Sequence, residues 1–316
     1  MTLAVLCLVL VQAGGAAGQP ADRRALIERA QSEVAAGRRV EAKRLLAAAA
    51  GKFESVQALL QLARLQATDG EVAAALDSLR KARALAPNSE EVLSAFAQVS
   101  MTAGAPVPAI LALDALTRMC PTVARHHYLL GVALMRGADM PAAVEALREA
   151  DRLEPDRALT LLALGVTLNN RQQYAEARPF LVRSLEIEPD NLDAVAALAE
   201  AELGAGDLDA AEAHARRTLA QIPDHATANM VSGLIAMEKG RYPEARAALE
   251  RAVAKDPFSL KAQYQLSLAC ARAGDAAAAR QHLEAYRQTM REIEKRVDEV
   301  RSATGPGRPS APPKKQ

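Results

Sequence analysis

The chain of 316 residues carries 39 Lys and Arg side chains against 38 Asp and Glu, which gives a formal net charge of +1. Aromatic residues make up 3% and tryptophan is absent, while alanine is abundant, so the composition favours helices that pack closely on small side chains. With no chain-wide positive field to neutralise phosphates, the sequence argues against nucleic acid as the main partner.

The chain begins with a short apolar segment, residues 3–11, followed by small residues up to Gly18. This segment is shorter than the roughly 20 apolar residues that a transmembrane helix needs, which favours a secretory signal peptide at 1–18 and a secreted or periplasmic protein. No Lys or Arg precedes the apolar core. The alternative is therefore an uncleaved N-terminal anchor that tethers the protein to a membrane, facing outside the cytoplasm.

Six of the 16 prolines recur at intervals of 34 residues: Pro87, Pro121, Pro155, Pro189, Pro223 and Pro257. Proline lacks a backbone N–H and disfavours helix in the residue before it, so the helix that contains Leu185 and Ile187 should end near Glu188. A fixed period of 20 to 50 residues is typical of a solenoid. The sequence therefore predicts one array of repeats over 56–293, with a degenerate first repeat at 23–55.

Each repeat divides into two halves with the 3 and 4 spacing of amphipathic helices. A glycine lies between the halves of six repeats, at Gly37, Gly70, Gly104, Gly206, Gly240 and Gly274. Glycine permits the left-handed conformation that ends a helix, so each repeat is predicted to be a helix, a tight turn and a second helix. The expected fold class is all-α, with about eight such repeats.

Two positions in the repeat predict how its helices pack. One position holds alanine in all eight repeats, and another holds only small residues, among them Gly131, Gly165 and Gly233. The position four residues after the alanine holds leucine in seven of the eight, including Leu147, Leu181 and Leu249. We expect the leucines to fill the space beside the small residues.

The residues "LG…YAEA…L…P" in 158–191 and "GRYPEARAALERAVAKDP" in 226–259 resemble the tetratricopeptide repeat. The resemblance covers 23–293, although the first helices lack the tryptophan of the family pattern. It implies a right-handed superhelix whose concave face is lined by the first helix of each repeat and which binds peptides or partner proteins there.

The first-helix positions expected to face that groove are largely apolar: Tyr128, Val132, Met135, Leu162, Val166, Asn169, Met230, Leu234, Met237, Tyr264 and Leu268. Asp193 and Glu200 interrupt the apolar face. We interpret it as a site for apolar or amphipathic segments of partner proteins, since methionine adapts to varied partners. The alternative is that tight curvature buries part of this face. A second functional hypothesis is a membrane-tethered assembly factor of an envelope or secretion complex.

The sequence contains few residues that could bind a metal or catalyse a reaction. His126 and His127 are adjacent, so on a helix they point about 100° apart and cannot chelate one metal; His127 is expected in a core position. Cys270 is expected to be buried and Cys120, before Pro121, to be exposed, too far apart for a disulfide. No phosphate loop or nucleophile motif appears, so the sequence predicts no enzyme activity, no cofactor and no metal site.

The last helix is predicted to extend beyond the final repeat, over 294–303. Apolar residues with 3 and 4 spacing form a stripe along this last helix, at Leu283, Tyr286, Met290, Ile293, Val297 and Val300. The stripe fits a helix that caps the array, and it also fits a coiled-coil contact with a partner or second copy, so the oligomeric state stays open. Residues 304–316 are rich in Pro and Gly and basic, which predicts a disordered tail.

Overall fold

A computed structural model describes residues 20–304, and these form sixteen α-helices and no strand. The predicted signal peptide or anchor at 1–18 and residues 305–316 of the predicted tail lie outside this range, while Thr304 is the last residue of the last helix. The helices are α1 Pro20–Ala35, α2 Arg39–Phe53, α3 Val56–Thr68, α4 Val72–Leu85, α5 Glu90–Thr102, α6 Pro106–Met119, α7 Ala124–Arg136, α8 Met140–Leu153, α9 Ala158–Asn170, α10 Tyr174–Ile187, α11 Leu192–Ala205, α12 Leu208–Gln221, α13 Ala226–Glu238, α14 Tyr242–Lys255, α15 Leu260–Arg272 and α16 Ala276–Thr304.

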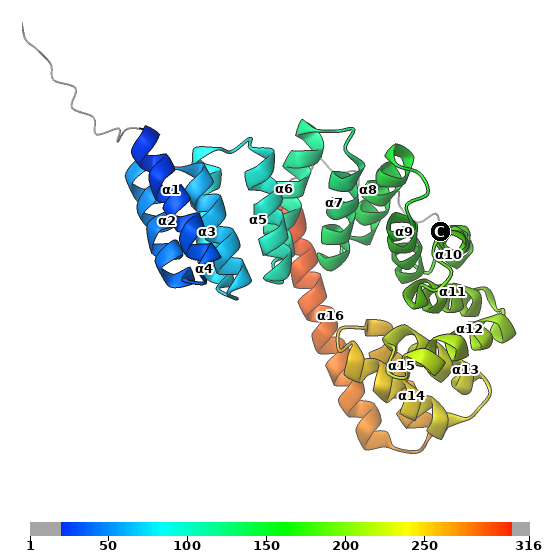
Figure 1. Ribbon diagram of the computed structural model, residues 1–316. Coiled ribbons are helices and arrows are strands. Elements are labelled where there is room, and N and C mark those ends of the chain that lie inside the picture. Colours follow the sequence, from blue (N-terminus) through cyan, green and yellow to red (C-terminus); the bar gives the residue numbers. More distant parts are fainter. Residues whose placement is uncertain (1–19, 305–316) are drawn as a thin grey trace, which may run out of the picture. The chain divides into compact units, whose positions relative to one another are not determined.

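The helices are joined two by two through tight turns, and most of them pack on the next helix along the chain (Figure 1). The all-α solenoid of helix-turn-helix repeats predicted from the sequence is thereby confirmed. The chain divides into two compact units, residues up to Val99 and residues from Ser100 onward, which we call unit 1 and unit 2 and describe separately.

The repeated prolines end the second helix of each pair. The helix α10 ends at Ile187 with Glu188 as its C-cap, as the sequence predicts, and α14 ends at Lys255, two residues before Pro257. All six turn glycines have positive φ, from 66° at Gly104 to 89° at Gly206, which confirms their predicted left-handed conformation. In the two repeats without a glycine there, Ala138 and Gln172 adopt the same conformation, at φ values of 63° and 59°.

The carbonyl of the repeated proline accepts a hydrogen bond from the side chain six residues later in three repeats. Asn229 Nδ2 lies 2.9 Å from the Pro223 carbonyl, Gln263 bonds that of Pro257, and His127 Nε2 lies 2.8 Å from that of Pro121. This bond corrects the expectation that His127 is a core residue. Its ring reaches toward the start of the helix and stays partly exposed, whereas His126 is the buried member of the pair.

The small and large positions of the repeat pack against each other as expected. A Cβ atom on Gly165 would lie 2.5 Å from Cγ of Leu181, and one on Gly233 would lie 2.6 Å from Cγ of Leu249. Both leucines are fully buried. Glycine at these positions therefore allows the two helices of a repeat to approach closely, which an alanine could match only if the leucine moved.

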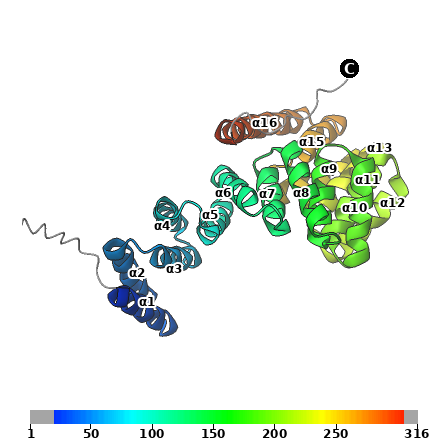
Figure 2. The ribbon, with the colours of Figure 1, turned by 90° about the horizontal axis from the view of Figure 1, so that it is seen from above.

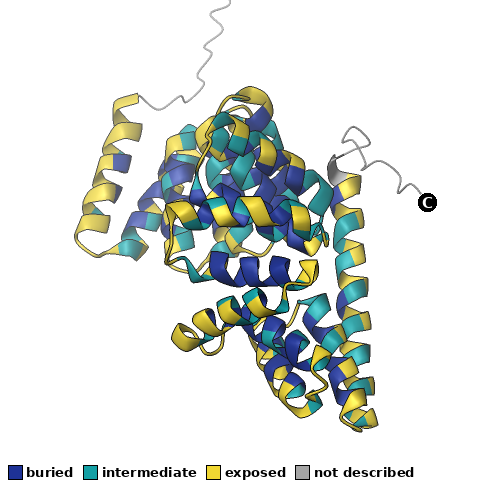
Figure 3. Cartoon of the chain, turned by 90° about the vertical axis from the view of Figure 1, so that its right-hand side faces the viewer, coloured by how far each residue is buried: buried dark blue, intermediate teal, exposed yellow. Residues whose placement is uncertain are grey.

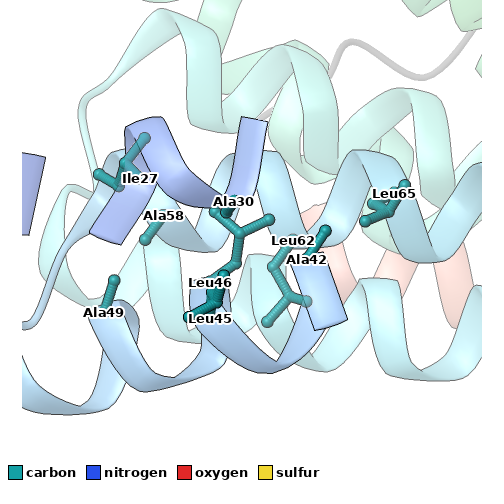
Figure 4. Packing of buried hydrophobic residues seen from close by; sticks show 9 residues of the cluster. All are labelled: Ile27, Ala30, Ala42, Leu45, Leu46, Ala49, Ala58, Leu62 and Leu65. Atoms are coloured by element: carbon teal, nitrogen blue, oxygen red, sulfur yellow. The ribbon is translucent and has the colours of Figure 1, made fainter. Parts of the chain in front are cut away.

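Unit 1 is built around a cluster of small and medium apolar side chains from α1, α2 and α3 (Figure 4). Ala30, Ala42, Ala49 and Ala58 are fully buried there beside Leu46. The alanines keep the three helices close, and burial of the leucines and Ile27 supplies most of the apolar area removed from water.

Unit 2 contains one pairing that the repeat does not predict. Its extensive pairings join helices one or two places apart, except that α16 packs on both α15 and α6, ten places away (Figures 1 and 2). Over its length α16 exposes many residues and buries few (Figure 3), but Val300 near its end is fully buried. The start of α16 therefore extends the last repeat, and its end returns to the beginning of unit 2.

Candidate functional site: a groove on the first helices of unit 2

Two adjoining spaces lie along the first helices of the repeats in unit 2. The first, of about 390 Å³, is bordered by residues of α9, α11, α13 and α15, with Leu162, Val166 and Met230 among its apolar walls. The second, of about 800 Å³, is bordered by the ends of α8, α9 and α10, by α15 and by α16. They share five residues, Asn170, Glu200, Asp256, Ser259 and Lys261. We call the two spaces together the groove.

Five of the eleven residues predicted from the sequence line the groove: Leu162, Val166 and Met230 in the first space, and Asn169 and Tyr264 in the second. Four others, Tyr128, Met135, Leu234 and Met237, pack half-buried against the cores of their repeats. Val132 is half-buried, and Leu268 is 37% exposed on α15; neither borders the two spaces.

Part of the predicted face is buried among the helices of unit 2. Met230 is 6% exposed and Asn169 is 2% exposed. Asn169 Nδ2 donates a hydrogen bond to the Ala197 carbonyl at 2.8 Å and so joins α9 to α11, while its Oδ1 is buried without a partner among the described residues. These residues form walls of the groove and also hold its repeats together.

An ion pair crosses the groove between repeats that are not consecutive. Lys261 Nζ on α15 lies 2.9 Å from Glu200 Oε1 on α11 and 3.3 Å from the hydroxyl of Tyr174 on α10. The same ammonium lies 5.3 Å from the centre of the Tyr174 ring, within the range of a cation–π interaction. Burial by itself would lower the pKa of Lys261, but the charge of Glu200 and the hydrogen bonds to Glu200 and Tyr174 outweigh it and raise the pKa. The ammonium therefore stays charged.

A second polar contact lies at the edge of the first space. His225, the N-cap of α13, accepts a hydrogen bond from the Ala228 amide at Nδ1, so its Nε2 carries the proton and donates to Asp193 Oδ1 at 3.0 Å. The acidic interruptions noted in the sequence thus both have partners on later helices, Asp193 at the start of α13 and Glu200 on α15.

The second space has aromatic walls, of which the sequence predicted Tyr264 as a groove residue but not Phe258 or Tyr286. Phe258 is 61% exposed and Tyr264 is 42% exposed, and the ring of Tyr264 lies 5.5 Å from that of Tyr286 on α16. Ile293 of α16 also borders this space, as do Asn169 and Gln172. Exposed aromatic residues are enriched where proteins bind other proteins, so this wall adds to the apolar surface of the groove.

Among residues 20–304, no cluster of His, Cys, Asp and Glu side chains could hold a metal ion. Over the same residues, every helix is too short or too polar to cross a membrane.

The family model of the tetratricopeptide repeat matches residues 27–90, 109–158, 162–226, 196–259 and 230–291. No curated protein sequence matches the chain.

Solved structures of similar fold include a tetratricopeptide repeat protein from Parabacteroides merdae, with a TM-score of 0.61 at 17% identity over 79% of this chain and 99% of that one. The Cut9–Hcn1 hetero-tetramer of the APC/C has a TM-score of 0.56 at 18% identity over 78% and 46% of the two chains. The human IFIT1 dimer with PPP-AAAA has a TM-score of 0.55 at 17% identity over 86% and 73%. At such identities these likenesses concern the fold alone.

Proposed function

Because the chain belongs to the tetratricopeptide repeat family, whose repeats are generally non-catalytic, we propose that it is a protein–protein interaction scaffold whose groove binds an apolar or amphipathic segment of a partner protein. The observation that carries this proposal is the pair of adjoining spaces along α9, α11, α13 and α15, whose walls combine apolar side chains with charged and amide groups. Concave surfaces in which polar groups are placed among apolar walls are usual sites of ligand recognition.

The charges around the groove favour a basic segment. Three carboxylates, of Asp193, Glu200 and Asp256, border it, and Lys261 neutralises one of them. A partner segment with apolar residues on one face and Lys or Arg on the other would match both the walls and the charges. The same carboxylates disfavour phosphate groups, which agrees with the expectation that nucleic acid is not the main partner.

Site-specific crosslinking tests this proposal. A photoreactive amino acid in place of Thr227, which lines the first space and is half-buried, should capture partner proteins from cells that make the protein. The same amino acid in place of Arg216, on the exposed surface of α12, provides the control for non-specific capture.

A blocking variant makes the result specific to the groove. Asn170 is exposed and borders both spaces, so Asn170→Trp should fill the groove without disturbing a core. We expect it to remove the crosslinks made at position 227, while Glu186→Trp, on an exposed part of α10, leaves them intact. Equal capture by the Asn170→Trp variant and the unchanged protein would show that the groove is not the binding site.

The apolar segment at 1–18 supports a location outside the cytoplasm. Either a cleaved signal peptide or a retained anchor would place the groove there, and the second would make the protein a tethered assembly factor of an envelope or secretion complex. The mass of the protein isolated from cells distinguishes the two, since cleavage after Gly18 removes 18 residues. The proposal of export fails if the protein is found with Met1 intact in the soluble cytoplasmic fraction.

A further inference from the structure

We propose that the surface where α6 meets the end of α7 is a docking site for an amphipathic helix, and that the last turns of α16 occupy it in the free chain and thereby close one side of the groove. The first observation is Val300, which is fully buried although most of its neighbours on α16 are exposed. A helix end that only solvated the array would have no reason to bury a side chain against a helix ten places away.

The surface that receives Val300 is shaped for a close approach. A Cβ atom on Gly137 would lie 3.1 Å from Cγ2 of Val300 and 3.0 Å from Cδ1 of Ile110 on α6, so any side chain at position 137 would press on both. Gly137 has a φ of −77°, a conformation open to every residue, and the turn's left-handed position is the next residue, Ala138. The backbone of Gly137 does not require a glycine, whereas the close approach of Ile110 and Val300 disfavours a larger residue there.

The occupant itself shows what kind of partner the surface fits. Ile293, Val297 and Val300 follow each other at spacings of 4 and 3, and they lie half-buried or buried while the residues between them are mostly exposed. Ile293 borders the second space of the groove, so the same helix face runs from the groove to Gly137. A partner helix with β-branched residues at these spacings would compete with α16 for the surface.

This placement makes the last turns of α16 a regulator of the groove. The part of the inference that concerns regulation rests on the proposed function, because Tyr286 and Ile293 of α16 form part of the wall that a partner in the second space would contact. The turn residues Ala138 and Gln172 also border that space.

The test uses the chain's own helix as the probe. A fluorescein-labelled peptide of residues 286–304 is titrated into the full-length protein and into its Val300→Asp variant, and fluorescence anisotropy reports binding. We expect the variant, whose α16 leaves the surface, to bind the peptide at least tenfold more tightly than the unchanged protein. Ser302→Asp is the matched control, since it adds the same charge at an exposed position two residues away and should behave like the unchanged protein.

A second substitution, on the receiving surface, completes the test. Adding Gly137→Val to Val300→Asp should abolish peptide binding, because the new side chain fills the space that Val300 occupied. Equal peptide binding by the unchanged, Val300→Asp and double variants would overturn the inference. A different outcome is that the peptide binds as expected but Asn170→Trp does not reduce crosslinking. That would contradict the proposed function of the groove and still support the docking site.

Discussion

At the scale of single residues, replacing Gly165 and replacing Gly51 with alanine should have opposite effects on stability. A Cβ on Gly165 would meet Cγ and Cδ2 of Leu181 at 2.5 Å, whereas one on Gly51, an exposed residue of α2, would meet nothing within 4 Å. Gly165→Ala should therefore lower the free energy of unfolding by about 1–3 kcal/mol through overpacking. Gly51→Ala should raise it by about 0.5–1 kcal/mol, since alanine favours a helix. Urea denaturation followed by circular dichroism measures both.

Leu181, which packs against Gly165, allows a double-mutant test. Leu181→Ala alone should cost about 2–5 kcal/mol, because it leaves a cavity in a fully buried position. The combination with Gly165→Ala should cost less than the sum of the two, since the repeat at 192–225 already pairs Ala199 with Ala215 at these positions. Strict additivity would contradict the idea that the small and large positions compensate each other.

The two described cysteines should differ in reactivity. Cys270 is fully buried, and burial, the largest effect, raises the pKa of its thiol although Arg246 opposes the shift. Cys120 lies at the C-cap of α6 with intermediate exposure. Iodoacetamide at pH 8 should label Cys120 first and Cys270 only after urea is added, because the thiolate is the reactive form. Peptide mass spectrometry reads out each site, and early labelling of Cys270 would contradict the packing described for α15.

At the scale of helices, the ion pair between Lys261 and Glu200 is expected to stabilise the arrangement of α11 and α15. The Glu200 side chain is 11% exposed, so Lys261→Met would leave its carboxylate without a cation. Since Lys261 itself is 35% exposed, we expect a loss of about 1–3 kcal/mol, less than for a fully buried pair. Adding Glu200→Gln to Lys261→Met should recover part of that loss. A double variant that is as unstable as Lys261→Met would show that the unpaired charge is not the cause.

The same pair predicts a dependence on pH. The pKa of Lys261 is raised in the folded chain, because the carboxylate of Glu200 and the hydroxyl of Tyr174 outweigh the effect of burial, which alone would lower it. The stability from the pair is thus present below the unfolded pKa of about 10.4 and is lost as the pH rises through the higher folded value. Urea midpoints of the unchanged protein and Lys261→Met should differ at pH 9 and converge at higher pH. A constant difference would contradict the assignment to the charge of Lys261.

Local features of the sequence predicted the helices well and the groove incompletely. The proline period placed the end of α10 at the right residues, because a helix stop depends on backbone chemistry within a few positions. The contact of Gly165 with Leu181 followed from the repeat itself. By contrast, Lys261 and Glu200 are 61 positions apart, and their contact depends on how strongly successive repeats rotate, which no short stretch of sequence specifies. The contact of Val300 with Gly137 spans even more of the chain.

At the scale of the whole molecule, a loss of stability in one repeat should affect the neighbouring repeats most. Extensive helix pairings join helices one or two places apart, apart from that of α16 with α6, so a repeat that loses its core should loosen its neighbours first. Leu46 in unit 1 and Leu249 in unit 2 are both buried in leucine positions of the repeat. Replacing either leucine with alanine should lower the free energy of unfolding of the surrounding repeats by about 2–5 kcal/mol.

Hydrogen exchange measured by mass spectrometry can map these effects. Leu46→Ala should speed exchange in α1 to α3 and leave α13 to α15 unchanged. The reason is that a local loss of stability should weaken with each helix that separates it from the substitution. Faster exchange in all the described helices with either substitution would mean that the chain unfolds as a single cooperative block.

The pairing of α16 with α6 makes a sharper prediction for Leu249→Ala. This substitution should speed exchange in α13 to α15, and because α16 is held by α15 and ends on α6, it should also speed exchange in α6. The intervening helices α9 and α10 should change less, although they are nearer in sequence. In a Val300→Asp background α16 no longer contacts α6, so Leu249→Ala should then leave α6 as it was. An effect on α6 that persists in this background would have to travel through every repeat in between, and unit 2 would be an open array whose ends are not joined by α16.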